Sequence, residues 1–261
     1  MNEVLSVLPE FSWVVVKPRA RDYLVDGVRY QRVTTALGII NKPALIPWAK
    51  RTTLAKVGET LLDPVVRGEL LVALEESPGE YEGFVERLLT RAGKATDEVR
   101  DESAGRGTAI HALVQEALFS PESAEEEPAI HSARAFITEY GITVCDLERV
   151  VWDDFHAIAG TIDGVGWRGD KLVIWDWKTG SHLYWEAALQ LAAYAFCLER
   201  LTGVEVHEAF GVRLPQEGGA PEVKRGGRVE LLAAMLPYFA ALSLYRAGSD
   251  KLWSEEEEED A

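Results

Sequence analysis

The sequence predicts an α/β protein in which strands and helices follow one another, with a β-hairpin at the N-terminus and a helical annex. Two apolar strands separated by a tight turn occupy residues 159–180, and helical patterns flank them on both sides. Between residues 54 and 100, helical segments follow one another without a strand. Because a chain of 261 residues can bury a full hydrophobic core, we expect a folded unit of enzyme size.

The composition is that of a soluble globular protein, but the charge is strongly acidic. Apolar residues make up 47% of the chain and charged residues 27%, which are ordinary values. The net charge is −16, and the run from Glu255 to Asp260 contributes six of the acidic residues. An acidic body is the opposite of the basic surface that nucleic-acid binders usually show. Binding of DNA therefore requires that metal ions neutralise some carboxylates and that local basic patches hold the phosphates.

The lack of a recognisable targeting signal and the small number of cysteines indicate a reducing compartment. No apolar run is long enough to cross a bilayer, and the first residues lack the basic start of a secretory signal. The two cysteines, Cys145 and Cys197, supply neither a disulfide framework nor a four-thiolate metal cluster. We expect an intracellular, reduced protein.

The N-terminal residues predict a β-hairpin followed by a short helix. One strand covers residues 13–16, another covers residues 23–25, and a turn at Asp26-Gly27 leads to a strand over residues 28–30. Thr34 or Thr35 is expected to cap a helix over residues 36–40.

Residues 42–51 combine an aromatic side chain with several cations. Trp48, Lys50 and Arg51 could hold a single DNA strand through base stacking and phosphate contacts. The alternative is that Trp48 anchors a helix and the cations only solubilise the surface. The helical pieces that follow, broken at Asp63-Pro64 and at residues 77–79, carry no chemical motif and form the expected annex.

A glycine-rich segment at residues 105–107 is expected to open a helix that continues to residue 118. Small residues there allow close approach of another backbone, and Arg106 is a candidate DNA contact. His111 lies early on this helix, where a single histidine is more often a packing residue than a metal ligand. An acidic loop over residues 121–128, a helix over 130–140 and a strand over 143–152 follow, and Glu148 on that strand could face solvent or the site.

The hairpin of residues 159–180 carries the chemistry. Side chains alternate across a strand, so Asp176 and Lys178 share one face while Trp175 and Trp177 share the other. The hairpin can bring Asp163 beside them, and two neighbouring carboxylates repel unless a cation such as Mg²⁺ or Mn²⁺ lies between them. A lysine there can hold an attacking water or a phosphate oxygen, which suits phosphodiester hydrolysis. The Asp-x-Lys triplet alone would also fit an exposed ion pair.

The C-terminal part predicts a helix over residues 184–201, a strand over 206–214 and a helix over 228–246. Gln190 and Tyr194 are four residues apart and therefore share one face of the first of these helices. Arg213 is either a phosphate contact near the sheet edge or an ordinary surface charge. Residues 251–261 are expected to form a disordered acidic tail.

Four signatures follow one another in a fixed order along the chain. They are His111 after the glycine-rich segment, Gly160-Thr161-Ile162-Asp163, Asp176-Trp177-Lys178-Thr179-Gly180, and Gln190 with Tyr194. In this order and on these expected elements, the chain resembles the RecB-like branch of the PD-(D/E)XK nuclease superfamily. The signatures span about a third of the chain, and the N-terminal part is similar to the start of small stand-alone, phage-type exonucleases.

The resemblance implies a restriction-endonuclease-like core over residues 105–250, in which helices flank a central mixed β-sheet, with the hairpin and annex in residues 1–104. It implies that Asp163, Asp176, His111 and the main-chain carbonyl of Trp177 bind Mg²⁺ or Mn²⁺, and an imidazole ligand makes Mn²⁺ attractive. Some relatives hold an iron–sulfur cluster with four cysteines, which this chain lacks.

The resemblance further assigns catalytic roles. Lys178 would orient or activate the attacking water, and Asp163 and Asp176 would be catalytic through the metal that they bind. Gln190 and Tyr194 would support the site or touch the DNA backbone.

The function implied by the resemblance is that of a metal-dependent DNA exonuclease of recombination, repair or phage DNA metabolism. It would act on single strands or DNA ends in a bacterial or host cytoplasm, with recombination or replication proteins as candidate partners and without a membrane. Two alternatives stay open. One is a module of the same fold that binds DNA or protein without cutting, which the acidic surface favours; the other is an endonuclease, because the catalytic residues do not distinguish cutting from an end and cutting within a strand.

Overall fold

The computed structural model describes residues 16–18, 22–40, 45–76, 78–119 and 127–249. The chain divides into two compact units, one within residues 1–40 and 110–261 and the other within residues 41–109. The sequence analysis placed the N-terminal hairpin with the annex in residues 1–104. In the structure the N-terminal strands instead belong to the same sheet as the rest of the core. The expected strand residues 13–15, the loop residues 121–126 and the tail 251–261 lie outside the described residues.

The larger unit is built on a mixed sheet, which confirms the predicted fold class. Among the described residues the sheet has eight strands: β1 (Val16–Pro18), β2 (Asp22–Val25), β3 (Val28–Arg32), β4 (Thr143–Asp153), β5 (Ile158–Arg168), β6 (Lys171–Lys178), β7 (Val206–Arg213) and β8 (Glu222–Gly227). The order is β1-β2-β3-β5-β6-β7-β8, and β4 pairs with β5 outside this path. The β3–β5 and β6–β7 pairs are parallel, whereas the other pairs are antiparallel.

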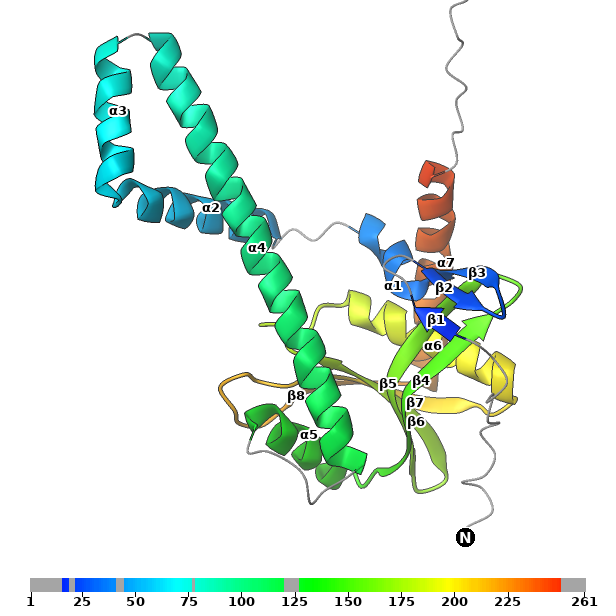
Figure 1. Cartoon of the computed structure of the whole chain (residues 1–261). Coiled ribbons are helices and arrows are strands. Elements are labelled where there is room, and N and C mark those ends of the chain that lie inside the picture. The colour runs from blue at the N-terminus through cyan, green and yellow to red at the C-terminus, as the bar shows by residue number, and fades with distance from the viewer. Residues whose placement is uncertain (1–15, 19–21, 41–44, 77, 120–126, 250–261) are drawn as a thin grey trace, which may run out of the picture. The chain divides into compact units, whose positions relative to one another are not determined.

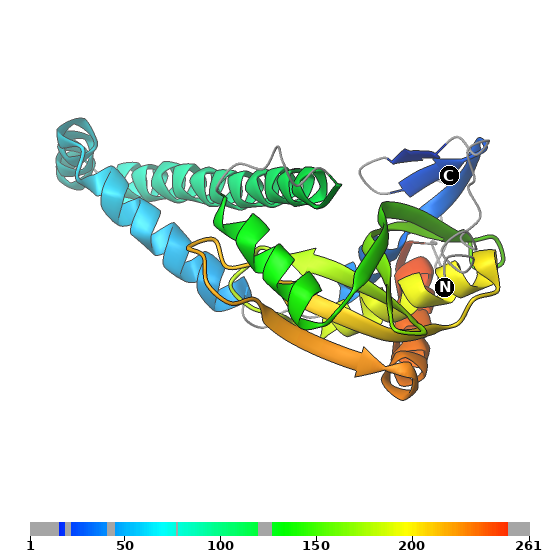
Figure 2. The same ribbon diagram turned by 90° about the horizontal axis from the view of Figure 1, so that it is seen from below.

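Helices cover both faces of this sheet (Figure 1). One core cluster joins the sheet to α1 (Val33–Ala36), the 3-10 helix η2 (Leu37–Ile39), α6 (Glu186–Thr202) and α7 (Arg228–Ser249). A second cluster joins it to α5 (Pro128–Glu139) and to residues 110–119 of α4 (Pro78–Phe119). Figure 2 shows α5 lying across the strands. The strands between the two layers are therefore shielded from water on both sides.

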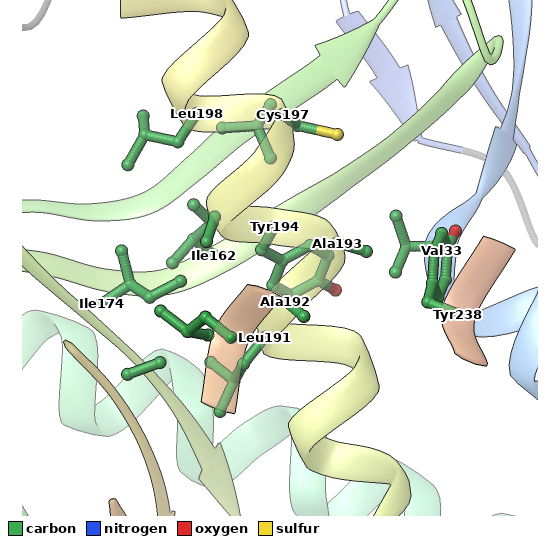
Figure 3. Packing of buried hydrophobic residues seen from close by; sticks show 14 of the residues in the cluster. Val33, Ile162, Ile174, Leu191, Ala192, Ala193, Tyr194, Cys197, Leu198 and Tyr238 are labelled. Carbon is green, nitrogen blue, oxygen red and sulfur yellow. The ribbon is translucent and has the colours of Figure 1, made fainter. Parts of the chain in front are cut away.

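Strand β6 is the central apolar strand that the sequence predicted. Leu172 and Ile174 belong to the cluster on the α6 side, whereas Val173 and Trp175 belong to the cluster on the α5 side. All four side chains are completely buried, and each contributes about 1.5–3 kcal/mol relative to an exposed position. Figure 3 shows Ile174 among the buried side chains of α6. This burial fixes the strand that ends in Asp176, Trp177 and Lys178.

Gly164 makes room for one of these side chains. It pairs with Trp175 across the β5–β6 ladder, and the indole lies directly over its backbone. A Cβ atom added at Gly164 would lie 1.9 Å from Cε2 of Trp175, a distance that no real Cβ contact shows. A side chain at position 164 would therefore displace the tryptophan from the core.

The smaller unit consists of α2 (Leu45–Leu61), α3 (Pro64–Glu76) and the N-terminal part of α4. Val66, Ala73 and Phe84 form its buried cluster. The predicted break at Asp63-Pro64 is confirmed: the Asp63 carboxylate accepts the Val65 N–H at 2.9 Å, and proline occupies the first helical position. This unit is the helical annex that the sequence predicted.

Two local predictions were wrong, and one strand was not predicted. The glycines at residues 105 and 107 do not open a helix, because they lie inside α4, which begins at Pro78. Neither Thr34 nor Thr35 caps a helix, since α1 begins at Val33 and its N-cap position is Arg32 without a side-chain hydrogen bond. Strand β8 was not expected. It forms because the chain turns back after Gly218 and Gly219, both at positive φ, and pairs with β7.

Helix α7 contradicts the expectation that no segment is long and apolar enough to cross a bilayer. Residues 228–248 satisfy that test by length and composition. Leu231, Tyr238 and Leu242 of this helix are nevertheless buried in the cluster shared with α6. One helix that passes this test by length and composition is only weak evidence of a membrane span.

We expect Gly164→Ala to lower the free energy of unfolding by about 1–3 kcal/mol, because the new methyl group overpacks the site of the Trp175 indole. Gly248→Ala is a matched control, since open space surrounds that helical glycine. Urea denaturation monitored by tryptophan fluorescence measures both. Equal stability of Gly164→Ala and the parent protein would contradict the packing described here.

Candidate active site

The candidate site lies where β5 and β6 separate. Strand β3 pairs with the start of β5 at Ile158 and Ala159, and β6 pairs with its end from Gly164 onward. Strand β4 occupies the other edge of β5 throughout, so residues 160–163 face an opening between β3 and β6. Within this opening the Trp177 N–H donates to Oδ2 of Asp163 at 2.6 Å. A side-chain carboxylate thus replaces a backbone carbonyl as the hydrogen-bond acceptor.

A hydrogen-bonded network joins Asp176 and Lys178 to helix α6. Nζ of Lys178 lies 2.5 Å from Oδ2 of Asp176, and it donates to Oε1 of Gln190 at 3.1 Å. Nε2 of Gln190 donates to Oδ1 of Asp176 at 2.6 Å and to the Tyr194 hydroxyl at 3.1 Å. Asp176 is only 2% exposed, so the structure does not contain the exposed ion pair that the triplet alone would have fitted.

Gly160 allows Tyr194 to reach this network. A Cβ atom at Gly160 would lie 2.4 Å from Cε1 of the tyrosine ring. Figure 3 shows Tyr194 on α6 beside Ile162 of β5. The glycine of the Gly-Thr-Ile-Asp signature, three residues before Asp163, is therefore needed for close packing between β5 and α6.

His111, Glu148 and Asp163 form a candidate metal site. One ligand atom from each residue lies within 4.8 Å of the others. Nδ1 of His111 is 3.5 Å from Oδ2 of Asp163. These atoms are an imidazole nitrogen and carboxylate oxygens, a donor set that fits Mn²⁺ and, through its oxygens, Mg²⁺. The residues present therefore fit the divalent ion that the resemblance implies.

Glu148 is the site residue that sequence reasoning left undecided. Leu147 pairs with Gly164 and Arg149 pairs with Ile162, so Glu148 stands opposite Asp163 on the neighbouring strand. Its backbone adopts φ of +54°, in the left-handed region that favours glycine. The sequence shows an acidic residue on a strand before the hairpin, but the pairing register that turns it toward Asp163 comes from tertiary structure.

Burial and mutual repulsion govern the protonation of these acids. Burial, followed by the charge of Asp176, raises the pKa of Asp163 well above its usual value, and Lys178 and the Trp177 N–H only partly oppose this. The same two causes raise the pKa of Glu148. Burial lowers the pKa of His111, although Asp176 and a hydrogen bond to the Trp177 main chain act in the opposite direction. The imidazole is therefore biased toward its neutral form, which binds metals.

Lys178 and Tyr194 are held in their usual protonation states. Burial alone would lower the pKa of Lys178, but its ion pair and hydrogen bond with Asp176 outweigh that effect and raise the pKa. Burial raises the pKa of Tyr194 well above its usual value, and the neighbouring acids add to this. At neutral pH the site therefore presents an ammonium group and a neutral phenol.

The predicted DNA contacts lie in different places. Arg213 stands beside Lys178 in the β6–β7 register, but its Nε pairs with Glu222 at 2.9 Å. The other four contacts, Trp48, Lys50, Arg51 and Arg106, belong to the smaller unit. The three cations are exposed and Trp48 is half-buried. These assignments remain predictions.

The chain belongs to the PD-(D/E)XK nuclease superfamily, which its sequence matches over residues 75–255. A comparison with curated proteins found no significant match.

Several solved structures show distant similarity. The alkaline exonuclease LHK-Exo from Laribacter hongkongensis is 14% identical, and the alignment covers 47% of this chain and 71% of that chain with a TM-score of 0.28. Its complex with dAMP is also 14% identical and aligns over 69% and 90% of the two chains with a TM-score of 0.34. A protein from Eubacterium rectale named as a candidate exonuclease is 12% identical over 57% and 72%, again with a TM-score of 0.34.

We expect Glu148→Gln to weaken Mn²⁺ binding by about tenfold or more, because the amide removes one negative charge and one anionic oxygen from the ligand set. Glu116→Gln on the exposed side of α4 is the control for loss of an acid in the same unit. Isothermal titration calorimetry measures both affinities. If the two variants bind Mn²⁺ equally well, Glu148 is not a ligand.

Proposed function

We propose that this protein is a metal-dependent DNA exonuclease that hydrolyses phosphodiester bonds in recombination, repair or phage DNA metabolism. The observation that carries the proposal is the convergence of the His111, Glu148 and Asp163 ligand atoms with the network of Asp176, Lys178 and Gln190 in a chain of the nuclease superfamily. A non-cleaving module would have no need for several buried acids in one place, since each costs stability when it lacks a partner.

Mg²⁺ or Mn²⁺ is the proposed cofactor. When bound, such an ion would polarise a phosphoryl oxygen and lower the pKa of a coordinated water. His111, Glu148 and Asp163 would hold it, with Asp176 and the carbonyl of Trp177 as further candidate ligands. Burial of Asp163 in a site of like charge supports this assignment, because a divalent cation would neutralise the repulsion that raises the carboxyl pKa.

Lys178 has an electrostatic role in the proposed reaction. Its raised pKa keeps the ammonium charged, so it is a poor proton acceptor and a good partner for anionic oxygens. Asp176 and Gln190 hold Nζ from the protein side, whereas about a third of the side chain remains exposed. A positive charge fixed there stabilises the negative charge that develops on the phosphoryl group during hydrolysis. Gln190 is a positioning residue, because it bonds both to the acid and to the lysine.

Lys178→Met is expected to lower kcat by about 100-fold or more, because it removes a cation that stabilises developing negative charge. Asp176→Ala should have a similar effect, because it removes the carboxylate that holds Lys178 in place and is a candidate metal ligand. End-labelled DNA incubated with Mn²⁺ or Mg²⁺ provides the assay. Asp170→Ala, in the exposed β5–β6 turn, is the matched control and should retain parental activity. Equal degradation by Asp176→Ala and the parent protein would refute the assigned site.

Linear and circular single strands of the same sequence distinguish exonuclease from endonuclease action. An exonuclease needs an end, so we expect the linear strand to be degraded while the circle persists. Gel electrophoresis of both substrates after equal incubation gives the answer. Circles that disappear as fast as linear strands would identify an endonuclease of the same fold.

A further inference from the structure

A small apolar cavity of about 220 Å³ lies on the α6 side of the sheet, between the start of α6, strands β7 and β8, and the first turn of α7. Leu183, Ala188, Leu191, Ala209 and Leu231 supply apolar walls. Two aromatic side chains also line it and are well exposed, Tyr184 at 43% and Trp185 at 59%. We infer that this cavity is a subsite for one unpaired base of the DNA strand that is cut, with Trp185 as the stacking side chain.

The register of the sheet places the cavity next to the candidate active site. Asp176 of β6 pairs with Gly211 of β7, and Gly211 pairs with Lys224 of β8. Residues opposite one another project to the same face, so the Asp176 carboxylate and the Lys224 side chain lie on the same side of the sheet. Two strand spacings separate them, about 10 Å. That is about three steps of a B-form strand at 3.4 Å each, and fewer when the strand is stretched.

Two features connect the site and the cavity. The residue between Asp176 and Lys224 in this row is Gly211, which carries no side chain of its own, and the buried Leu183 packs over it with Cδ2 3.8 Å from where a Cβ atom would lie. The chain also leads directly from one to the other, since residues 179–185 join Lys178 to Trp185 at the start of α6. A strand whose phosphate contacts Lys178 can therefore pass along residues 179–185 and place in the cavity a base about one to three nucleotides away.

The size and chemistry of the cavity fit a single planar ring system. Pockets for drug-sized ligands measure about 300–1,000 Å³, and this one is smaller. Aromatic side chains stack on the face of any base, so such a contact tolerates sequence differences. Lys224 adds a cation: its Nζ donates to the Leu183 carbonyl at 2.6 Å, and an ammonium has two further donors for a base or phosphate oxygen. Glu230 also lines the cavity, but its Oε2 accepts the Gly227 N–H at the start of α7.

Among the bases of DNA, an unpaired one fits this arrangement. A base within a duplex keeps both faces stacked on its neighbours, so it cannot offer one to Trp185 unless it leaves the helix. The subsite therefore assigns the proposed nuclease to single strands or to frayed ends, and this inference rests on the proposed function. It also explains how an acidic protein can hold DNA with few cations, because stacking adds affinity that does not depend on charge.

Binding of a fluorescein-labelled single strand, followed by anisotropy with Ca²⁺ in place of Mg²⁺ or Mn²⁺ so that the carboxylates stay neutralised, tests the subsite, and a gel run afterwards verifies that the strand is uncut. We expect Trp185→Ala to raise Kd about fivefold or more, and Trp185→Phe to stay within about twofold of the parent. Phe155→Ala is the matched control, since Phe155 is an exposed aromatic residue in the β4–β5 turn and does not line the cavity. Circular dichroism verifies that each variant is folded, and Tyr184→Ala gives a second probe of the cavity.

A series of strands with one abasic nucleotide at successive positions locates the base. The parent should lose about fivefold in affinity at one position, and Trp185→Ala should show no such position. A parent that cuts DNA but shows no Trp185-dependent position would refute the subsite and leave the nuclease assignment intact. Equal loss by Trp185→Ala on blunt duplex and on single strands would refute recognition of an unpaired base. A parent that cuts no DNA with Mn²⁺ or Mg²⁺ would refute the proposed function and, with it, a subsite for the strand that is cut.

Discussion

The structure depends on two carboxylates that are buried where β5 and β6 separate. A buried charge without a partner costs several kcal/mol, so each acid must be compensated. Asp176 has an ammonium and an amide as partners, whereas Asp163 has one backbone N–H and a nearby imidazole. The raised pKa of Asp163 shows that the protein alone compensates it incompletely. The separation of β5 and β6 thus creates the opening and orients the two acids. It also leaves the Asp163 carboxylate without a full counter-charge, which a bound cation would supply.

The rest of the core serves to hold that arrangement. Four completely buried side chains anchor β6 before it reaches Asp176, and helix α6 brings Gln190 to the end of the strand. Gly160 and Gly164 are needed for the same arrangement, because an aromatic ring occupies the space that a side chain at either position would fill. Trp175 fills the α5 side and Tyr194 fills the α6 side, so the two layers are packed against the one strand that carries Asp163.

The sequence correctly predicted those features of the site that follow from the periodicity of a single strand or helix. Alternation along β6 correctly separated Asp176 and Lys178 from Trp175 and Trp177, and the spacing of four residues placed Gln190 and Tyr194 on one face of α6. Properties set by distant contacts were not predictable. The β4–β5 register, for example, decides that Glu148 stands opposite Asp163. The continuation of α4 through Gly105 also runs against local propensity, because glycine usually weakens a helix. The cavity at Trp185 likewise exists only because β8 and α7 close it.

Glu148 carries a consequence for the evolution and engineering of this protein. Its backbone at φ +54° would be easier for glycine, which has no Cβ atom to crowd the chain, whereas its carboxylate is one of the three groups of the candidate metal site. A glycine there would relax the strand and empty the site of one acid. Selection for stability therefore favours glycine at position 148, whereas selection for catalysis favours glutamate. Among variants selected only for thermal stability, we expect replacement of Glu148 to be an early cause of lost activity.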